Sequence, residues 1–231
     1  MTVGRRLERG LLVGAGLVAL AIVLPLGVLV RDGWAPLRNA DARASAAGTL
    51  PDGLAREMVV AVTQLGAPLL LEVLALLLCL LLVRRKRARL AAYVGLTVFG
   101  AQALSFTTKL IVERVRPCEG LVSCPITTSF PSGHAVGAAA FWTALAVVLL
   151  PLVGKRAWAL LLIPPVVALT RVLLGVHYPS DVTAGLLMGG CWAAACTAVF
   201  SAWRAQDVGH EVPLEEGMDD VGEREQSART R

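Results

Sequence analysis

The stretch FPSGHAVGAAAFWTALAVVLLPLV, residues 130–153, joins a short polar sequence to a long apolar run that carries no charge after His134. The hydrocarbon core of a bilayer is about 30 Å thick, and an α-helix needs roughly 20 apolar residues to cross it. The apolar run 135–154 has this length. We therefore predict a membrane-spanning helix that starts directly after a histidine.

The rest of the chain repeats this apolar pattern. Of the 231 residues, 56% are hydrophobic, whereas soluble domains usually hold about 45–50%. Further runs with little or no charge occupy 11–30, 58–83, 90–108, 157–176 and 182–203, and Arg171 alone interrupts the run 157–176. The pattern predicts an all-α fold, a six-transmembrane-helix bundle over residues 1–204, and leaves no room for a separate soluble domain.

The first run, 11–30, has an alternative interpretation. Arginines at positions 5, 6 and 9 precede it, as positive residues precede the apolar region of a signal peptide. That region is about 7–15 residues long in signal peptides, shorter than this run. We expect a retained span, with a cleaved signal peptide as the alternative.

Basic residues predict the orientation of the bundle. The sequence RRKRAR, 84–89, holds five basic residues in six, and the next short loop on the same side holds Lys155 and Arg156. Such loops favour the cytoplasm, which places both termini there. We expect the outer loop 31–57 to hold a short helix near 39–47. The segment 205–231, with eight acidic residues, is expected to be a disordered cytoplasmic tail.

Two polar connections, 109–134 and 171–181, are separated by the two predicted spans 135–154 and 157–176. Two crossings return the chain to the side from which it started. Both connections therefore face the same water in either orientation, and a joint site between them is possible.

The first connection contains two candidate anion-binding groups. Lys109 and Arg116 are seven residues apart, which is close to two helical turns. If the helix continues to residue 116, both cations lie on one face. The alternative is that each side chain only reaches back to the membrane interface.

The same connection ends in Pro131, Ser132, Gly133 and His134. Serine can cap a helix, glycine allows a ligand close to the backbone, and the free N–H groups at a helix start bind anions. The alternative is an ordinary helix cap followed by a histidine that faces solvent.

The second connection contains Arg171, His177 and Asp181. An ionisable residue within an apolar run indicates a functional site, and a carboxylate beside a histidine can fix its tautomer. The alternative is an exposed contact worth about 0–1 kcal/mol. Taken together, three cations suit a dianionic phosphoryl group, and two histidines suit a nucleophile and a leaving-group acid.

These three motifs, Lys109-x6-Arg116-Pro117, Pro131-Ser132-Gly133-His134 and Arg171-x5-His177-x3-Asp181, resemble those of the type 2 phosphatidic acid phosphatase (PAP2) superfamily. One departure is Thr170, where the family often has serine. The resemblance implies that His177 is a nucleophile that forms phosphohistidine, that Asp181 orients it and that His134 protonates the leaving group. It also implies a phosphate-binding set, Lys109, Arg116, Ser132, Gly133 and Arg171.

The resemblance further implies a metal-independent bacterial lipid phosphatase without a cofactor, in the cytoplasmic membrane, with its site facing outward. Expected substrates are polyprenyl (undecaprenyl or decaprenyl) diphosphate, phosphatidylglycerol phosphate or phosphatidic acid. The alternatives are a lipid phosphotransferase with the same phosphohistidine and a non-catalytic lipid transporter. The net charge of +5 follows from the topology, so no nucleic-acid partner is expected, and the oligomeric state stays open.

Five further residues carry smaller expectations. Cys118 and Cys124 lie in the outer connection, where an oxidising compartment permits a disulfide; two free thiols are the alternative. Glu113 and Arg114 are expected to form a local ion pair. Glu72, within the run 58–83, has three open roles: lining the substrate groove, pairing with a neighbour or staying neutral.

Overall fold

The computed structural model describes residues 10, 21, 23–48, 50–117 and 128–210, and every regular element in these ranges is helical. This confirms the all-α prediction. Residues 23–31 are α-helical and precede the numbered elements. These elements are α2 (Ala35–Gly48), α3 (Leu54–Thr63), η1 (Gln64–Gly66), α4 (Pro68–Arg84), α5 (Ala88–Val112), α6 (Gly133–Val153), η2 (Gly154–Leu162), α7 (Ile163–Leu173) and α8 (Pro179–His210).

Three helical runs among the described residues are long and apolar enough to cross a membrane: Ala88–Val112, Gly133–Leu173 and Pro179–Ser201. A fourth is added if the bent pair Leu54–Gly66 and Pro68–Arg84 counts as one span. This pair covers the predicted run 58–83, but it bends by 41° at its break. Most of the predicted first span, 11–30, lies outside the described residues.

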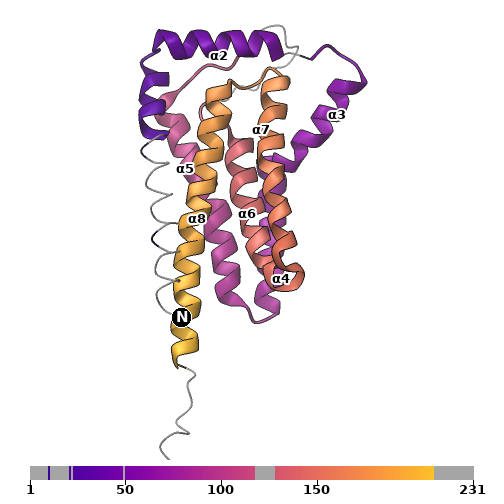
Figure 1. Ribbon diagram of the computed structural model, residues 1–231, viewed down its shortest axis with the longest axis vertical. Helices are drawn as coiled ribbons and strands as arrows, with labels where there is room; N and C mark the ends of the chain where they lie inside the picture. The colour runs from indigo at the N-terminus through magenta and orange to yellow at the C-terminus, as the bar shows by residue number, and fades with distance from the viewer. Residues whose placement is uncertain (1–9, 11–20, 22, 49, 118–127, 211–231) are drawn as a thin grey trace, which may run out of the picture. The chain divides into compact units, whose positions relative to one another are not determined.

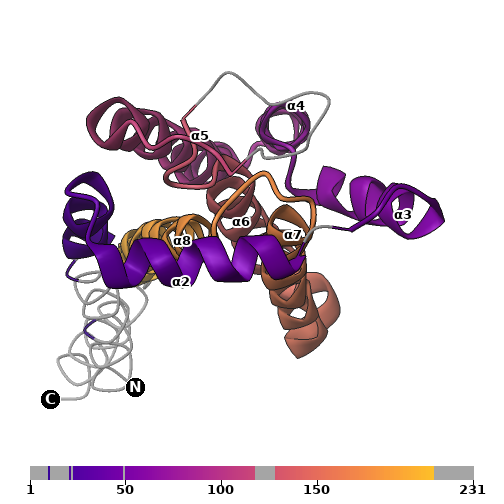
Figure 2. The same ribbon diagram turned by 90° about the horizontal axis from the view of Figure 1, so that it is seen from above.

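The run Gly133–Leu173 folds back on itself. Helices α6 and α7 lie side by side (Figures 1 and 2), and the 3-10 segment η2 joins them. Helix α7 begins at Ile163, six residues after the predicted start of its span, with Pro164 in its first turn. Proline has no N–H to donate within a helix but fits the first turn, where that N–H has no partner. The prolines therefore fix the start of α7.

Glycines bring α8 against α6. A Cβ atom at Gly185 would lie 2.8 Å from the Ser132 carbonyl oxygen, and one at Gly189 would lie 2.3 Å from the Val136 carbonyl oxygen. Small residues four apart allow two helix backbones to approach closely in a membrane. This contact places the second and third turns of α8 beside the start of α6.

Replacing Gly189 by alanine is expected to destabilise the bundle, because the new methyl group meets backbone rather than a movable side chain. Overpacking of this kind costs about 1–3 kcal/mol. The matched control is Gly190→Ala on the same helix, where a Cβ meets nothing within 4 Å. Thermal unfolding in detergent, followed by tryptophan fluorescence, should show a lower Tm for Gly189→Ala only. Equal Tm values for the two variants would contradict the close contact.

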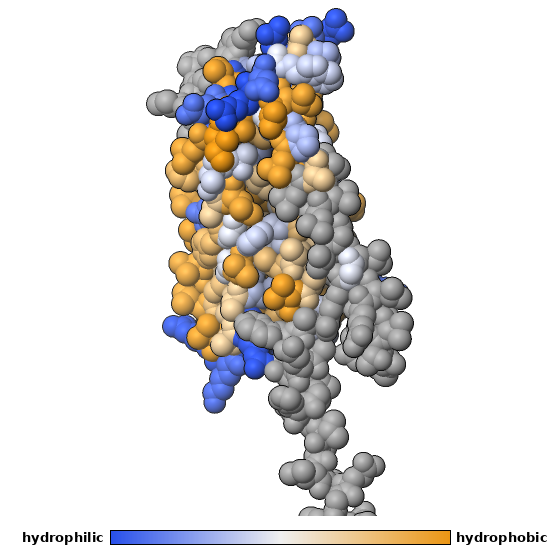
Figure 3. All heavy atoms as spheres, turned by 90° about the vertical axis from the view of Figure 1, so that its left-hand side faces the viewer, coloured by the Kyte–Doolittle hydropathy of each residue, from blue (hydrophilic) through white to orange (hydrophobic). Residues whose placement is uncertain are grey.

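Helix α2 runs across one end of the bundle, over the ends of α7 and α8 (Figures 1 and 2). It confirms the short helix predicted near 39–47. The connection between α4 and α5, which carries the basic sequence RRKRAR, lies at the opposite end. Between the two ends, the face in Figure 3 is largely apolar. Large apolar side chains such as Leu69, Leu77 and Phe106 are exposed, as in a helix surrounded by lipid.

Helix α8 continues to His210, past residue 205, where the predicted tail begins. Ala205 and Gln206 favour a helix, which lets α8 extend past its apolar part. The rest of the predicted acidic tail, 211–231, lies outside the described residues.

Candidate functional site

The three sequence motifs meet at the end of the bundle that α2 covers. The Ser132 N–H donates to the Asp181 carbonyl oxygen at 3.0 Å, which joins the start of α6 to the start of α8. An Arg116 Nη1 group lies 2.9 Å from His177 Nε2. Both polar connections therefore lie on one side, as two crossings of the chain require.

The hydrogen bonds of His177 define its tautomer. A guanidinium only donates, so His177 Nε2 accepts from Arg116 and the ring proton is on Nδ1, which lies 3.4 Å from Asp181 Oδ2. The imidazole is 1% exposed. Burial lowers the pKa of His177 from 6.5 to about 4, against the opposing effect of the hydrogen bond to Asp181. The ring is therefore neutral at physiological pH, with the lone pair on Nε2.

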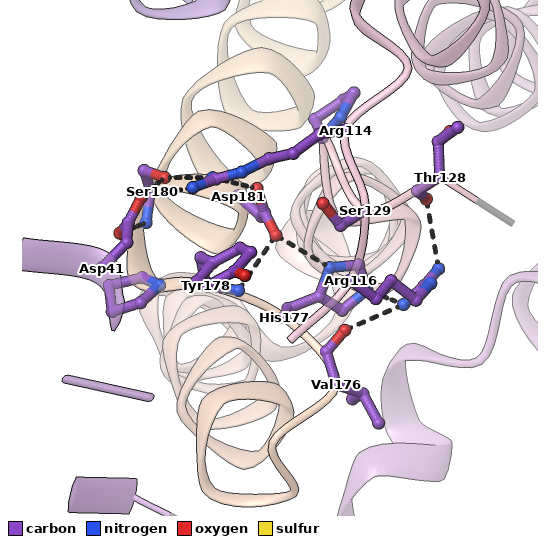
Figure 4. A network of polar contacts seen from close by, with 12 residues as sticks. Asp41, Arg114, Arg116, Thr128, Ser129, Val176, His177, Tyr178, Ser180 and Asp181 are labelled. Atoms are coloured by element: carbon purple, nitrogen blue, oxygen red, sulfur yellow. Dashed lines mark hydrogen bonds and ion pairs between the residues drawn. The ribbon is translucent and has the colours of Figure 1, made fainter. Parts of the chain in front are cut away.

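Asp181 is held on both carboxylate oxygens in the first turn of α8 (Figure 4). Oδ2 accepts the Tyr178 N–H at 2.9 Å and faces His177, while Oδ1 accepts from Arg114 at 2.7 Å. The carboxylate is fully buried. The contact with His177 thus comes from the start of α8 rather than from a helix that runs through both residues.

The expected ion pair between Glu113 and Arg114 is wrong. Helix α5 ends at Val112, and Glu113 takes a left-handed conformation with φ 50°. This turn leaves Glu113 exposed and directs Arg114 toward Asp181 and Asp41, which it contacts at 2.7 and 2.8 Å. Sequence reasoning missed Asp41 and the role of Arg114. The available signals were an arginine two residues before Arg116 and an acidic residue within the predicted outer helix.

Lys109 and Arg116 do not share a continuous helix, because α5 stops between them. Both nevertheless reach the Thr128 carbonyl oxygen, Lys109 Nζ at 2.9 Å and Arg116 Nη2 at 3.3 Å. Lys109 also donates to the Pro131 carbonyl oxygen at 2.8 Å, and Arg116 to that of Val176 at 3.0 Å. The two cations therefore hold the segment before α6 against the segment before α8.

Two buried donors at this site have no hydrogen-bond partner among the residues that the structure describes. Ser132 occupies the N-cap position of α6, but its side chain makes no capping bond. Its Oγ and the Nε of Arg171 are buried without a hydrogen-bond partner among the described residues, although Arg171 Nη1 reaches Thr63 Oγ1 at 3.3 Å. Buried polar groups are nearly always paired. Unpaired donors that lie beside the free N–H groups of a helix start indicate an anion site.

The site surrounds His134, the second residue of α6. The side chains of Arg171, His177, Arg116 and Lys109 all lie within electrostatic range of its imidazole. The imidazole of His134 is half-buried and forms no hydrogen bond with any side chain or backbone group that the structure describes. The histidine at the start of α6 therefore lies among the cations of the other two motifs.

Three other residues singled out in the sequence do not join this site among the described residues. Cys118 and Cys124 lie outside the described residues. Glu72 is partly exposed on α4, and its three open roles stay open. Within the described ranges, no group of three or more His, Cys, Asp or Glu side chains is arranged to hold a metal ion.

Comparison with known protein sequences identifies the family of the chain. Residues 89–205 match the model of the PAP2 superfamily. The chain is 37% identical over 131 residues to decaprenylphosphoryl-5-phosphoribose phosphatase of Mycobacterium tuberculosis, covering 55% of this chain and 70% of that protein. It is 35% identical over 123 residues to lipid A 1-phosphatase of Rhizobium etli, covering 49% and 51%.

The fold resembles the crystal structure of a transmembrane PAP2-type phosphatidylglycerolphosphate phosphatase from Bacillus subtilis. The TM-score is 0.74 at 24% identity, covering 81% of this chain and 96% of that one. The match to the PAP2 family model, residues 89–205, extends from α5 to α8. It therefore includes all three motifs and the helices that carry them. The chain therefore belongs to the PAP2 superfamily and is a membrane-embedded phosphoric ester hydrolase.

Proposed function

We propose that the protein is a metal-independent lipid phosphatase that acts through a phosphohistidine on His177. One observation carries the proposal: His177 is neutral, its Nε2 lone pair faces Arg116, and its Nδ1 proton faces Asp181. A nucleophilic nitrogen needs this tautomer. The carboxylate then stabilises the positive charge that the ring gains when Nε2 bonds to phosphorus.

The reaction has two steps. In the first, His177 Nε2 forms a bond to phosphorus, the bond from phosphorus to the leaving oxygen breaks, and His134 gives that oxygen a proton. In the second, His134 takes a proton from water, the water oxygen bonds to phosphorus, and the N–P bond breaks to release phosphate. A bound dianion favours the charged form of a nearby imidazole, so substrate binding prepares His134 as the acid.

The cations and free donors neutralise the transferred group. Arg171, Arg116 and Lys109 supply positive charge, and Ser132 Oγ and the Gly133 N–H supply hydrogen bonds to the non-bridging oxygens. Fixed donors of this kind need no reorganisation as charge moves in the transition state. The unpaired Ser132 Oγ and Arg171 Nε support this assignment, since a bound phosphoryl group would satisfy both.

The substrate class follows from where the site lies. It is at one end of an apolar bundle, so the phosphate head group can enter it while the hydrocarbon stays in the membrane. The relatives are named for decaprenylphosphoryl-5-phosphoribose and lipid A, which are both phosphorylated lipids. We place polyprenyl (undecaprenyl or decaprenyl) diphosphate first among the substrates, ahead of phosphatidylglycerol phosphate and phosphatidic acid.

The orientation in the membrane follows from charge. The basic connection between α4 and α5 lies at the end opposite α2, and basic connections favour the cytoplasm. The site then faces outward across the bacterial cytoplasmic membrane. With six spans over residues 1–204, both termini and the segment 205–231 lie inside.

The proposal is tested by phosphate release from purified protein with a panel of lipids: undecaprenyl diphosphate, phosphatidylglycerol phosphate and phosphatidic acid. Each is assayed with and without excess EDTA. We expect release in every case, the highest kcat/KM with undecaprenyl diphosphate, and less than a twofold change with EDTA. Loss of activity in EDTA that added Mg²⁺ restores would overturn metal independence. Transfer of phosphate to an added alcohol without release would indicate a phosphotransferase.

A further inference from the structure

A chain of buried charges connects helix α2 to the carboxylate that faces His177. Arg114 Nη2 donates to Asp41 Oδ2 at 2.8 Å, and Arg114 Nη1 donates to Asp181 Oδ1 at 2.7 Å. The side chains are 12% exposed for Arg114, 4% for Asp41 and 0% for Asp181. Figure 4 shows Arg114 lying between the two carboxylates. Charged side chains that are buried to this extent need partners of opposite sign and a complete set of hydrogen bonds.

Arg114 fixes the rotation of the Asp181 carboxylate. The terminal torsion of an aspartate is soft and close to two-fold, so one anchored oxygen does not hold the other in place. In this site the Tyr178 N–H and the Nδ1 of His177 engage Oδ2, and Arg114 engages Oδ1. Without Arg114, the carboxylate could turn away from Nδ1 while it kept the bond to Tyr178.

Asp41 in turn fixes Arg114 and the start of α8. Its Oδ1 accepts the Ser180 N–H at 3.1 Å, and its Oδ2 accepts from both the Ser180 hydroxyl and Arg114. It therefore caps the first turn of the helix that carries Asp181. The Arg114 guanidinium also lies 4.0 Å above the centre of the Tyr178 ring, which limits its movement out of the plane.

We propose that Asp41 and Arg114 are positioning residues that hold Asp181 in the orientation in which it fixes the tautomer of His177. The inference rests on the proposed function, because it assigns these residues to the same reaction. Within the described ranges, the side-chain hydrogen bonds and ion pairs of Asp41 and Arg114 do not include a group proposed to bind phosphate. Helix α2 thereby contributes to the chemistry, although all of the recognised motifs lie after it in the sequence.

The geometry requires an arginine at position 114. Two nitrogens of one planar group reach two carboxylates on different helices, and a lysine offers a single nitrogen on a flexible stem. Asparagine at position 41 would keep only some of the hydrogen bonds that Asp41 accepts. Its amide has one oxygen for three donors, and its NH₂ group would face an N–H or O–H donor where the carboxylate now accepts.

The test compares Asp41→Asn with Asp181→Asn and with the double variant, all with undecaprenyl diphosphate. Misplacing a reacting group by about 1 Å costs roughly 100-fold in rate, and we expect kcat to fall about 10- to 100-fold in Asp41→Asn with KM changed less than threefold. Arg114→Lys should behave in the same way. The matched control is Asp52→Asn, an exposed carboxylate that pairs with Arg56 ahead of α3, and it should retain wild-type kcat.

The double variant separates positioning from a merely structural role. If Asp41 acts through Asp181, adding Asp41→Asn to Asp181→Asn costs less than threefold more, because the group being positioned is already inactive. Losses that multiply would overturn the proposal, and so would a wild-type kcat in Asp41→Asn. Failure of the proposed function looks different, since the wild-type protein itself would then release no phosphate.

Nitrogen-15 NMR of the histidine side chain adds a readout that needs no substrate. The wild-type protein should show His177 protonated on Nδ1, with that proton shifted downfield by Asp181. In Asp41→Asn the proton should move upfield, and in Asp52→Asn it should stay in place. An unchanged Nδ1 proton in Asp41→Asn would overturn the inference even if the enzyme were inactive for another reason.

Discussion

His177→Ala is expected to lower kcat for phosphate release on the order of 10⁴-fold or more, the scale seen when a nucleophile is removed from a triad. The reason is that Nε2 is the atom that bonds to phosphorus in the proposed reaction. His177 is also held neutral by burial, with its proton directed to Asp181. No neighbouring side chain offers the same lone pair in the same position, because Arg116, Arg171 and Lys109 are donors only.

The measurement is alkaline quenching of the enzyme with ³²P-labelled polyprenyl diphosphate, since phosphohistidine survives in alkali and is lost in acid. The wild-type protein should retain label that acid removes, and His177→Ala should retain none. His210→Ala, which changes the only histidine outside the motifs, should behave like the wild type. A labelled enzyme in His177→Ala, or full turnover there, would show that the nucleophile lies elsewhere.

His134→Ala should lower kcat by about 10²- to 10⁴-fold on a lipid substrate, the usual contribution of a general acid or base. The loss should be much smaller for the first step with p-nitrophenyl phosphate, whose leaving group departs without a proton. Water activation in the second step still needs His134. With the p-nitrophenyl substrate, this variant is therefore expected to accumulate phosphohistidine, seen as a burst of p-nitrophenol followed by slow turnover.

The two substrates provide the internal control for His134. Equal losses on both, with no burst, would mean that His134 only contributes to binding or to packing at the start of α6. His134→Gln is a useful companion variant, because it keeps a polar side chain of similar reach but cannot exchange a proton at neutral pH. It should match His134→Ala in rate.

The sequence was sufficient to predict the helical class and the meeting of two connections, because both follow from simple constraints. Apolar length determines a span, and the number of crossings determines the side. Arg116 and His177 are 61 residues apart, yet they are in contact at 2.9 Å. The motif residues themselves were identified by resemblance, and their catalytic roles remain predictions for the experiments above.

The missed features depend on tertiary contacts that have no local signal. In the sequence, Asp41 is one of several charged residues in a polar loop. Only the folded structure shows that α2 holds it against Ser180 and Arg114. The end of α5 at Val112 depends on one left-handed residue, Glu113, a conformation that sequence patterns do not predict for glutamate. The bend between α3 and α4 likewise interrupts a run that is apolar throughout.

The glycine contact between α6 and α8 limits the route by which a lipid tail can enter. A hydrocarbon chain that lay between two helices would need roughly 7 Å between the centres of their facing atoms, twice the carbon contact distance of about 3.5 Å. At Gly185 and Gly189 there is not even room for a methyl group. This seam is closed along the first turns of α6, so the hydrocarbon tail of the proposed lipid substrate is expected to approach the site through a different side of the protein.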